Sequence, residues 1–208
     1  GRRKVLARHA KMARRLGHEM VATPARSSNA GGLQGGVMFS GLQHLCIEYR
    51  REERSDLAGL RFQGLDWVAV ILRQKKANLP MVTAYFDVRD GTAKSNLQRI
   101  LQIQELIFGL NMPWTIVADW NNTVEELTQA GWDRDLGGRF VQLEGVNSVI
   151  GGRNIDFALV SQELFPHVRL IPEARGSWKT HLGFWLVIDT PLRIIRGRRI
   201  TCPQAVAL

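Results

Sequence analysis

The stretch Ile116-Val117-Ala118-Asp119-Trp120-Asn121 is an apolar strand that ends in polar side chains. Along an extended chain, Asp119 and Asn121 point to the same side and Trp120 points to the other. Polar side chains at the carboxyl end of a strand commonly build a site. An acid beside an amide can orient a water and bind a phosphoryl oxygen. Asp and Asn also cap turns and helices, and the motif by itself favours that structural role about equally.

A second stretch, Asn154-Ile155-Asp156-Phe157-Ala158-Leu159-Val160-Ser161, places a lone acid in an apolar strand. A buried carboxylate needs a partner. Arg153 is the nearest one, and His181 is the alternative with chemical interest. An Asp–His pair raises the basicity of the imidazole and fixes its tautomer. The other histidines fit surface or packing positions: His9, His18, His44 and His167.

Tyr85, one of only two tyrosines, lies in the apolar run Met81–Phe86. Taken alone, it fits a core aromatic residue whose hydroxyl is satisfied by a neighbour. It becomes a candidate for contacting phosphoryl oxygens only in combination with the two motifs above.

The net charge of +9 is concentrated at the two ends of the 208-residue chain. Residues 1–15 and 190–208 together carry 11 basic residues and no acidic ones, which leaves 17 basic and 19 acidic residues in the body. Basic ends are suited to phosphate contacts with a nucleic acid. The usual behaviour of charge runs favours the alternative, a solvated helix face and a tail.

Composition excludes several classes of protein. With 23% charged and 45% hydrophobic residues, the chain is not a disordered polymer, and its length suits one domain over 1–189 followed by a basic tail over 190–208. Its apolar runs are far shorter than the roughly 20 residues that span a bilayer, so no membrane association is expected. No secretory signal is visible. Two cysteines are too few for a disulfide framework, which favours a reducing compartment.

Strands dominate the expected elements, with few helices and a central hairpin, and this pattern indicates an α/β fold with a mixed sheet. The glycine pairs Gly31-Gly32 and Gly35-Gly36 lack the spacing of a phosphate-binding loop. Ser95 is the expected N-cap of the central helix and Gly109 its stop. The expected helices cover 2–16, 95–109 and 123–130; the expected strands cover 37–40, 67–73, 81–86, 114–118, 140–143, 155–160 and 182–188, with a polar turn at 74–80.

Taken in order, several short motifs form a wider pattern. They are Gly35-Gly36-Val37, Val82-Thr83-Ala84-Tyr85, the Asp119 and Asp156 stretches quoted above, and Thr180-His181. The set resembles the endonuclease/exonuclease/phosphatase superfamily, which includes abasic-site endonucleases, deoxyribonuclease I and the endonuclease domains of LINE-type retrotransposons. The similarity extends from the first helix to His181.

The resemblance implies a four-layer α/β sandwich of two packed mixed β-sheets flanked by helices, with the first strand missing. It implies metal-dependent hydrolysis of phosphate esters, usually with Mg²⁺, nucleic acid as the partner and an origin in a mobile element. Carried over by position, Asp119 would orient or activate the attacking water, and Asn121 and Tyr85 would contact the phosphate. His181, held by Asp156, would stabilise the developing charge.

The sequence departs from the family pattern at the positions that are expected to bind the metal. The family's strand-end Asn and metal-binding Glu are expected upstream of Gly1, and Thr180 stands where the family has an Asp. The metal ligands are therefore unassigned, and little or no nuclease activity is expected. Two alternatives remain: an inactive relic that binds nucleic acid, and an interaction module that shares only the fold. Salt-dependent DNA binding separates these two, and metal-dependent turnover separates an enzyme from both.

Overall fold

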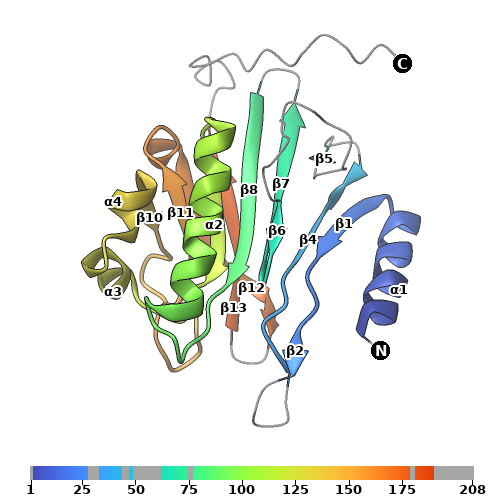
Figure 1. Ribbon diagram of the computed structural model, residues 1–208, viewed down its shortest axis with the longest axis horizontal. Coiled ribbons are helices and arrows are strands. Elements are labelled where there is room, and N and C mark those ends of the chain that lie inside the picture. Colours follow the sequence, from blue (N-terminus) through green and yellow to red (C-terminus); the bar gives the residue numbers. More distant parts are fainter. Residues whose placement is uncertain are drawn as a thin grey trace.

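The computed structural model describes residues 2–27, 33–43, 47–48, 62–74, 77–178 and 181–189. Within these ranges, four α-helices and one 3-10 helix lie among the strands (Figure 1). The helices are α1 (Arg2–Arg15), α2 (Lys94–Leu110), α3 (Val124–Gln129), α4 (Trp132–Leu136) and η3 (Phe165–His167). The strands are β1 (His18–Ala22), β2 (Arg26–Ser27), β3 (Leu33–Gln34), β4 (Met38–Leu42), β5 (Ile47–Glu48), β6 (Gln63–Gly64), β7 (Trp67–Gln74), β8 (Ala77–Tyr85), β9 (Thr115–Asp119), β10 (Gly138–Val141), β11 (Asp156–Ser161), β12 (Val168–Trp178) and β13 (His181–Ile188).

The main sheet has seven strands in the order β10-β11-β9-β8-β7-β5, with β6 also paired to β7. Among the described strands, only the β8–β9 pair is parallel, because α2 carries the chain from the end of one strand back to the start of the next. The predicted hairpin is confirmed as β7–β8. Its turn is shorter than expected, because β8 already begins at Ala77. Pro80 is tolerated inside β8 because β9 pairs only from Met81 onward.

Strand β7 is apolar on both faces because each face meets a different layer. Trp67, Ala69 and Ile71 belong to the large core that also contains the buried side of α2. Val68 and Val70 form a second core with Val21 of β1, against which Phe39 of β4 packs. The main sheet therefore lies between a helical layer and a second β layer.

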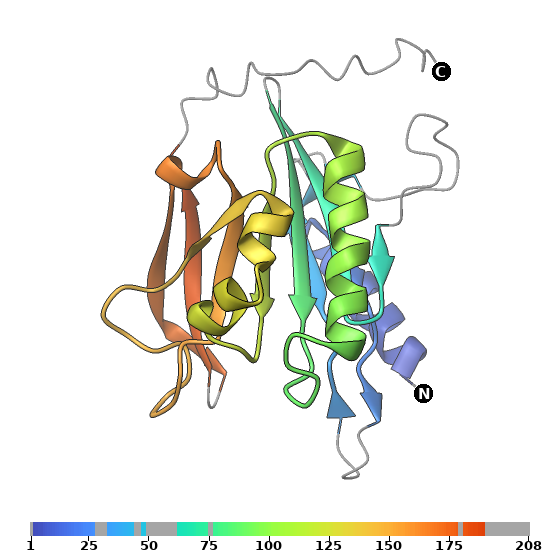
Figure 2. The ribbon, with the colours of Figure 1, turned by 60° about the vertical axis from the view of Figure 1, so that its left-hand side comes forward.

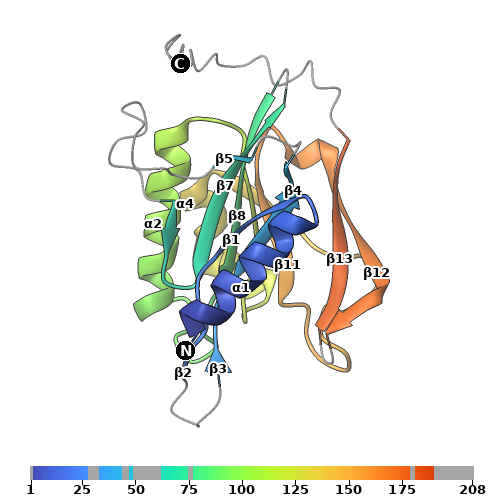
Figure 3. The ribbon, with the colours of Figure 1, turned by 90° about the vertical axis from the view of Figure 1, so that its right-hand side faces the viewer.

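The second β layer consists of two separate antiparallel pairs, β1–β4 and β12–β13. Leu182, Phe184 and Leu186 of β13 face the large core, as does buried Leu170 of β12. Figure 3 shows α2 on one side of the main sheet and the β12–β13 hairpin on the other, with α1 packed beside β1. In Figure 2 the red-orange hairpin and the blue N-terminal segment lie at opposite sides of the view. The predicted α/β sandwich is confirmed.

Both predicted ends of the central helix are wrong. The helix begins one residue before Ser95, and the cap position is Ala93, which has no capping side chain. Ser95 instead bonds the carboxylate of Asp90. Gly109 lies inside α2, and Asn111 ends the helix in the left-handed conformation, with its backbone N–H donating to the Ile107 carbonyl. Asn accepts this conformation nearly as well as Gly, since its side chain bonds locally.

Besides the two-residue strands β2, β3, β5 and β6 and the short η3, three longer elements have no counterpart among the expected ones: β1, α4 and β12. Strand β12 contains Arg169, Pro172 and Glu173, and its pairing with β13 shifts register beyond Glu173. Proline and charged residues are typical of an edge strand, where one row of backbone groups needs no strand partner. Such a strand has no continuous apolar run, so the sequence pattern does not predict it. Across the described residues, no helix has both the length and the apolar character needed to cross a membrane.

The short helix α3 is held at its start by a reciprocal pair of hydrogen bonds. The Glu126 backbone N–H donates to the Thr123 hydroxyl at 3.3 Å, and the Thr123 backbone N–H donates to the Glu126 carboxylate at 2.7 Å. This capping box satisfies two backbone donors that the helix itself leaves unpaired. The predicted helix at 123–130 is confirmed.

Thr123→Ala removes the cap of α3. We expect a loss of about 1 kcal/mol of unfolding free energy, measured by urea denaturation. Thr128→Ala, at an exposed position of the same helix, is the matched control and should be neutral or slightly stabilising. Equal effects of the two substitutions would show that the cap contributes nothing.

Candidate active site

The register of three adjacent strands brings Tyr85, Asp119 and Asp156 to one end of the main sheet. Asp156 lies directly across from Asp119 in the antiparallel β11–β9 pair. Tyr85 pairs with Asp119 in the parallel β8–β9 pair. Residues far apart in the sequence therefore form one row, at the carboxyl ends of β8 and β9. This is where the sequence predicts a site.

His181 completes the group from the second β layer. Its Nδ1 lies 2.8 Å from Asp156 Oδ2. The backbone around it is fixed, because His181 bridges Val149 and the Leu182 N–H donates to the Ser148 carbonyl at 2.7 Å. Of the two partners that the sequence leaves open for Asp156, the structure selects His181.

Arg153, the other partner considered for Asp156, is engaged elsewhere. Its guanidinium lies 3.5 Å from the Glu126 carboxylate and donates to the Asn121 carbonyl at 3.3 Å. These contacts tie the loop before β11 to the loop after β9.

Ser148, which the sequence analysis does not single out, fixes the backbone at Asp156 by hydrogen bonds. Its side chain is fully buried, and its hydroxyl oxygen accepts hydrogen bonds from the backbone N–H groups of Ile155 and Asp156, at 2.9 and 2.8 Å. No pattern marks this serine, because it lies in a glycine-rich segment that reads only as loop.

Asn121 does not continue the strand as expected. Its φ is 52°, in the left-handed region that Asn tolerates, so it is not placed by strand alternation. Its backbone N–H donates to the Asp119 carboxylate at 3.2 Å, and its side-chain amide donates to the Phe86 carbonyl at 2.8 Å. The turn role that the motif also allowed is therefore real, and phosphate binding by Asn121 stays a prediction.

Trp120 points away from the site, as predicted, and forms its floor. It is fully buried and stacks between Phe86, at 4.8 Å between ring centroids, and Phe157, at 5.6 Å. Its indole N–H donates to the Phe157 carbonyl at 3.0 Å. The stack packs the segments on either side of Asp119 into the large core.

Two groups of the site have pKa values moved toward neutrality. Burial and the neighbouring Asp156 carboxylate raise the pKa of Asp119 to about 6, against smaller opposing effects of His181 and the Asn121 N–H. Burial lowers the pKa of His181, but the hydrogen bond with Asp156 and the charges of Asp156 and Asp119 outweigh it, so the net shift is upward. Groups with such shifts, gathered at one point, are typical of catalytic sites.

Asp119, Asp156 and His181 also form a group suited to a cation. One ligand atom from each lies within 4.8 Å of the others, and all three residues are partly buried. Two carboxylates with room for water and phosphate suffice for Mg²⁺, which rarely takes a full protein cage. A dication would also relieve the repulsion that raises the pKa of Asp119. The residues present therefore fit a divalent metal.

Tyr85 is half-buried beside this group. Burial raises the pKa of its phenol, the negative charges of Asp119, Asp87 and Asp66 raise it further, and a side-chain hydrogen bond with Gln34 opposes them. The tyrosine is therefore a neutral hydrogen-bonding group at physiological pH. Its contact with a phosphate stays a prediction.

A buried ionic cluster fixes the segment that carries Tyr85, and the sequence gives no sign of it. Asp66 Oδ2 lies 2.9 Å from Arg26 and 3.0 Å from Arg99, and Arg26 reaches Asp87 at 3.4 Å. The Tyr85 N–H donates to the Asp66 carbonyl at 2.9 Å. The cluster joins residues that are distant in sequence, so no local pattern reveals it.

The pair Gly35-Gly36 serves this cluster rather than a phosphate. The Gly36 N–H donates to the Asp66 carboxylate at 3.0 Å, and both glycines have positive φ, 65° and 81°. A Cβ on Gly35 would lie 2.3 Å from that carboxylate. Only glycine permits this close approach.

Several features named in the sequence analysis lie outside the described residues: Thr180, His44, the pair Gly31-Gly32 and the whole tail over 190–208.

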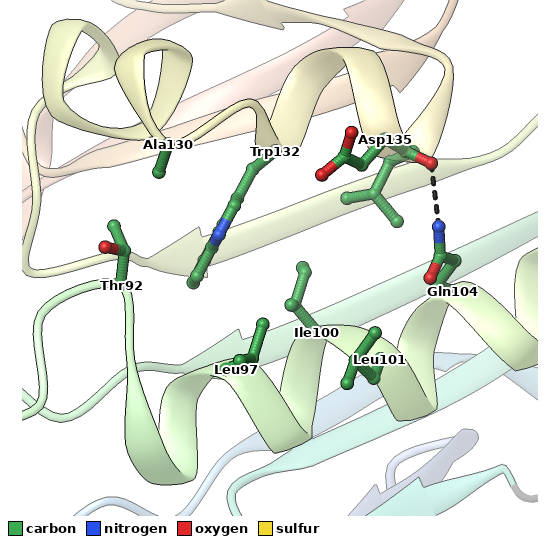
Figure 4. Close-up of a pocket in the computed structure, with 9 residues that line it drawn as sticks. Thr92, Leu97, Ile100, Leu101, Gln104, Ala130, Trp132 and Asp135 are labelled. Carbon is green, nitrogen blue, oxygen red and sulfur yellow. Dashed lines mark hydrogen bonds between the residues drawn. The ribbon is translucent and has the colours of Figure 1, made fainter.

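A cavity in the helical layer is separate from this site. It lies between α2 and the α3–α4 layer, where Leu97 and Leu101 extend from α2 and Trp132 extends from the opposite side (Figure 4). Among the described residues that line the cavity, Thr92 alone comes from the loop between β8 and α2. The cavity lacks the gathered titratable groups of the Asp119 site.

Comparison with known proteins identifies the fold. No family model matches the chain, and no curated protein matches it by sequence. Solved structures do match. The endonuclease domain of TRAS1, a telomere-specific non-LTR retrotransposon, aligns over 87% of this chain and 91% of its own, with a TM-score of 0.59 and 12% identity. The chain has the endonuclease/exonuclease/phosphatase fold.

Two further structures agree with this assignment. The human Nocturnin catalytic domain aligns over 86% of this chain and 73% of its own, with a TM-score of 0.55 and 16% identity. An endonuclease/exonuclease/phosphatase family protein from Bacteroides thetaiotaomicron aligns over 88% and 76%, with a TM-score of 0.50 and 11% identity. The family resemblance read from the sequence is thus confirmed at the level of fold.

Asp119→Asn should stabilise the metal-free protein at pH 8. Because the pKa of Asp119 is raised from 3.8 to about 6, stability falls as pH rises through this interval and stays lower above it. The amide keeps the acceptor for Asn121 and removes the charge. We expect a gain on the order of 1–3 kcal/mol at pH 8 and little difference at pH 4, from urea denaturation in the presence of a chelator. The same gain at both pH values would contradict the assignment.

Asp66→Asn should strongly destabilise the fold, because it leaves the buried guanidinium of Arg99 short of its charge partner. We expect a loss of about 3 kcal/mol or more in urea denaturation. Glu105→Gln, at an exposed position of α2, is the control for removing one negative charge and should change stability by less than about 0.5 kcal/mol. A loss below about 1 kcal/mol for Asp66→Asn would show that solvent replaces the ion pair.

Proposed function

We propose that this chain is a metal-dependent phosphodiester hydrolase of the endonuclease type that acts on nucleic acid. The observation that carries the proposal is the 2.8 Å Asp156–His181 hydrogen bond beside Asp119, in a chain with the endonuclease/exonuclease/phosphatase fold. The TRAS1 domain, an endonuclease by its description, supports the choice of nucleic acid and an origin in a retrotransposon.

In the proposed reaction, Asp119 orients the attacking water and accepts its proton as the new P–O bond forms. Asp119 is ionised at neutral pH, as a group that accepts a proton from the water must be. His181, whose pKa is raised by its hydrogen bond with Asp156, faces the charge that develops on the phosphoryl oxygens as the bond to the leaving oxygen breaks. Asn121 and Tyr85 contact the phosphate.

A bound divalent cation, with Mg²⁺ as the family's usual ion, would supply Lewis-acid stabilisation of the same charge. Asp119 and Asp156 are the carboxylates that would hold it. The carboxylates expected upstream of Gly1 and at position 180 are not needed for this minimal set.

Nicking of supercoiled plasmid with added Mg²⁺ or Mn²⁺ tests the proposal. We expect wild-type nicking, and we expect His181→Ala and Asp119→Asn each to slow it by at least about 100-fold, the usual share of a general base or charge stabiliser. His9→Ala, on the exposed surface of α1, is the matched control and should retain full activity. The assay also decides the sequence-based expectation of little or no activity. Nicking that survives both active-site substitutions would refute the assigned roles.

A non-catalytic role in nucleic-acid binding is the second candidate, and α1 favours it. Its side chains Arg8, Lys11, Arg14 and Arg15 are exposed along the helix. Phosphate contacts by such a face make affinity fall steeply with salt. Replacing Arg8 and Lys11 by Gln should lower the slope of log affinity against log salt by about 2. An unchanged slope would leave the helix as a solvated surface.

A further inference from the structure

Two exposed arginines lie on loops at the two sides of the Asp119 site. Arg89 follows β8, the strand that ends in Tyr85. Arg153 precedes β11, the strand that begins with Asp156. Because the sheet order is β11-β9-β8, the two loops leave the same end of the sheet on opposite sides of β9 and its terminal Asp119. Neither arginine has a part in the proposed reaction.

Arg153 lies next to Asn121, and it can exchange its carboxylate partner for a phosphate. Its Nη2 donates to the Asn121 carbonyl at 3.3 Å, and its Nη1 lies 3.5 Å from the Glu126 carboxylate. The side chains of Arg153 and Glu126 are 52% and 48% exposed, so solvent screens this ion pair and it adds little to stability. A phosphate can therefore compete with Glu126 for the guanidinium at small cost.

Arg89 is connected to Tyr85 through a single side chain, that of Gln34. The Arg89 Nη2 donates to the Gln34 side-chain oxygen at 3.0 Å, and a side-chain hydrogen bond joins Gln34 to the Tyr85 phenol. The Asp87 carboxylate accepts from the Arg89 Nε at 3.2 Å and from Nη2 at 3.1 Å. Within the described residues these contacts use Nε and Nη2, which leaves the N–H groups of Nη1 for a ligand.

The start of the loop that carries Arg89 is fixed by Asn96, a fully buried residue of α2. The Asn96 side-chain oxygen accepts from the Asp87 backbone N–H at 2.8 Å, and its amide donates to the Asp87 carbonyl at 2.8 Å. The Arg89 backbone N–H donates to the Asp87 carboxylate at 3.0 Å. Arg89 is therefore held beside the site before a substrate binds, which lowers the entropic cost of a contact with it.

The buried ionic cluster next to the site has more positive than negative charges. Its ion-paired side chains are two carboxylates and three guanidiniums: Asp66, Asp87, Arg26, Arg89 and Arg99. The Arg99 side chain is 3% exposed, that of Arg26 31% and that of Arg89 57%. Asp90, whose charge also acts on Arg89, accepts a hydrogen bond from the Ser95 N–H at the start of α2. The most exposed positive group of the cluster is thus the Arg89 guanidinium, a group suited to phosphate.

The width of the site corresponds to a run of phosphates. Strands β11 and β8 lie two strand spacings apart, which is about 10 Å. One strand of a nucleic acid advances about 3.4 Å per nucleotide along the helix axis, so this width covers about three successive phosphates. A substrate with a single phosphate cannot contact both sides.

We infer that Arg153 and Arg89 bind the two phosphates that flank the scissile one, one on each side, so that the site selects polynucleotides over substrates with a single phosphate. The inference rests on the proposed hydrolase function, which places the scissile phosphate at Asp119, between the two arginines. Arginine fits this task because its planar guanidinium donates parallel hydrogen bonds to phosphate oxygens.

Binding of a fluorescent DNA duplex of about 12 base pairs, measured by anisotropy with a chelator present, tests the inference without any turnover. Titrations between roughly 50 and 200 mM salt give the slope of log affinity against log salt. We expect Arg89→Gln and Arg153→Gln each to lower this slope by about 0.9, the share of one phosphate contact, and the double variant to lower it by about 1.8. Arg89→Lys and Arg153→Lys keep the charge and should keep the slope.

Arg169→Gln is the matched control, because it removes an exposed, ion-paired arginine far from the site. The Arg169 Nε lies 3.1 Å from the Asp189 carboxylate, and Arg169 pairs with Val187, at the other end of β13 from His181. This variant should leave the slope unchanged. An unchanged slope in Arg89→Gln or in Arg153→Gln, or an equal decrease in Arg169→Gln, would overturn the inference.

Hydrolysis with Mg²⁺ or Mn²⁺ gives a second measurement. Each Gln variant should lose at least about 10-fold more kcat/KM on the duplex than on bis(4-nitrophenyl) phosphate, which has one phosphodiester. Equal losses on both substrates would show that the arginines do not act on flanking phosphates. Absence of cleavage by wild type, with the salt slopes lowered as expected, would refute the hydrolase proposal and leave the two phosphate contacts standing, so the two failures are distinguishable.

Discussion

The pairing of β9 with β8 on one side and β11 on the other is the constraint on which the site depends. Strand register is set over several residues of buried apolar contacts, so Asp119 cannot move without moving Ile116 and Ala118 in the core. The same register aligns Tyr85 and Asp156 with it. The chemistry is therefore positioned by the packing of side chains that take no part in it, with the Phe86–Trp120–Phe157 stack directly beneath.

This arrangement holds two carboxylates close together at the end of a buried sheet, at a cost in stability that shows in the raised pKa of Asp119. Such strain is common where function and folding make opposite demands. The protein offsets it locally: His181 partners Asp156, Ser148 fixes the backbone of Asp156, and the Asn121 N–H bonds Asp119. A bound cation would remove the remaining repulsion, so ion binding and folding are expected to reinforce each other.

The parts that follow from local patterns were predictable from the sequence. The β7–β8 hairpin, β9, α3 and β11 all carry apolar periodicity or cap residues. The need of a buried acid for a partner predicted one for Asp156 but left Arg153 and His181 both open, and the structure selects His181. The parts that depend on distant contacts were not. Asp66 and Arg99 look like surface residues until the fold buries them together. Ser148 lies in a loop without pattern, and β12 has the proline and charges of an edge. The direction of the Asn121 side chain could not be predicted either. Alternation of side chains holds only along an extended strand, and the backbone at Asn121 is left-handed, with a φ of 52°.

The position of His181 on the last described strand has a consequence for synthesis of the protein in the cell. Every other member of the site is made earlier, and the N-terminal parts of a chain can fold while the ribosome still adds residues. Until β13 emerges and docks, the nascent domain has Tyr85, Asp119 and Asp156 but lacks the imidazole that organises them. The site is therefore complete only after the residues of β13 have been synthesised and have docked on the main sheet.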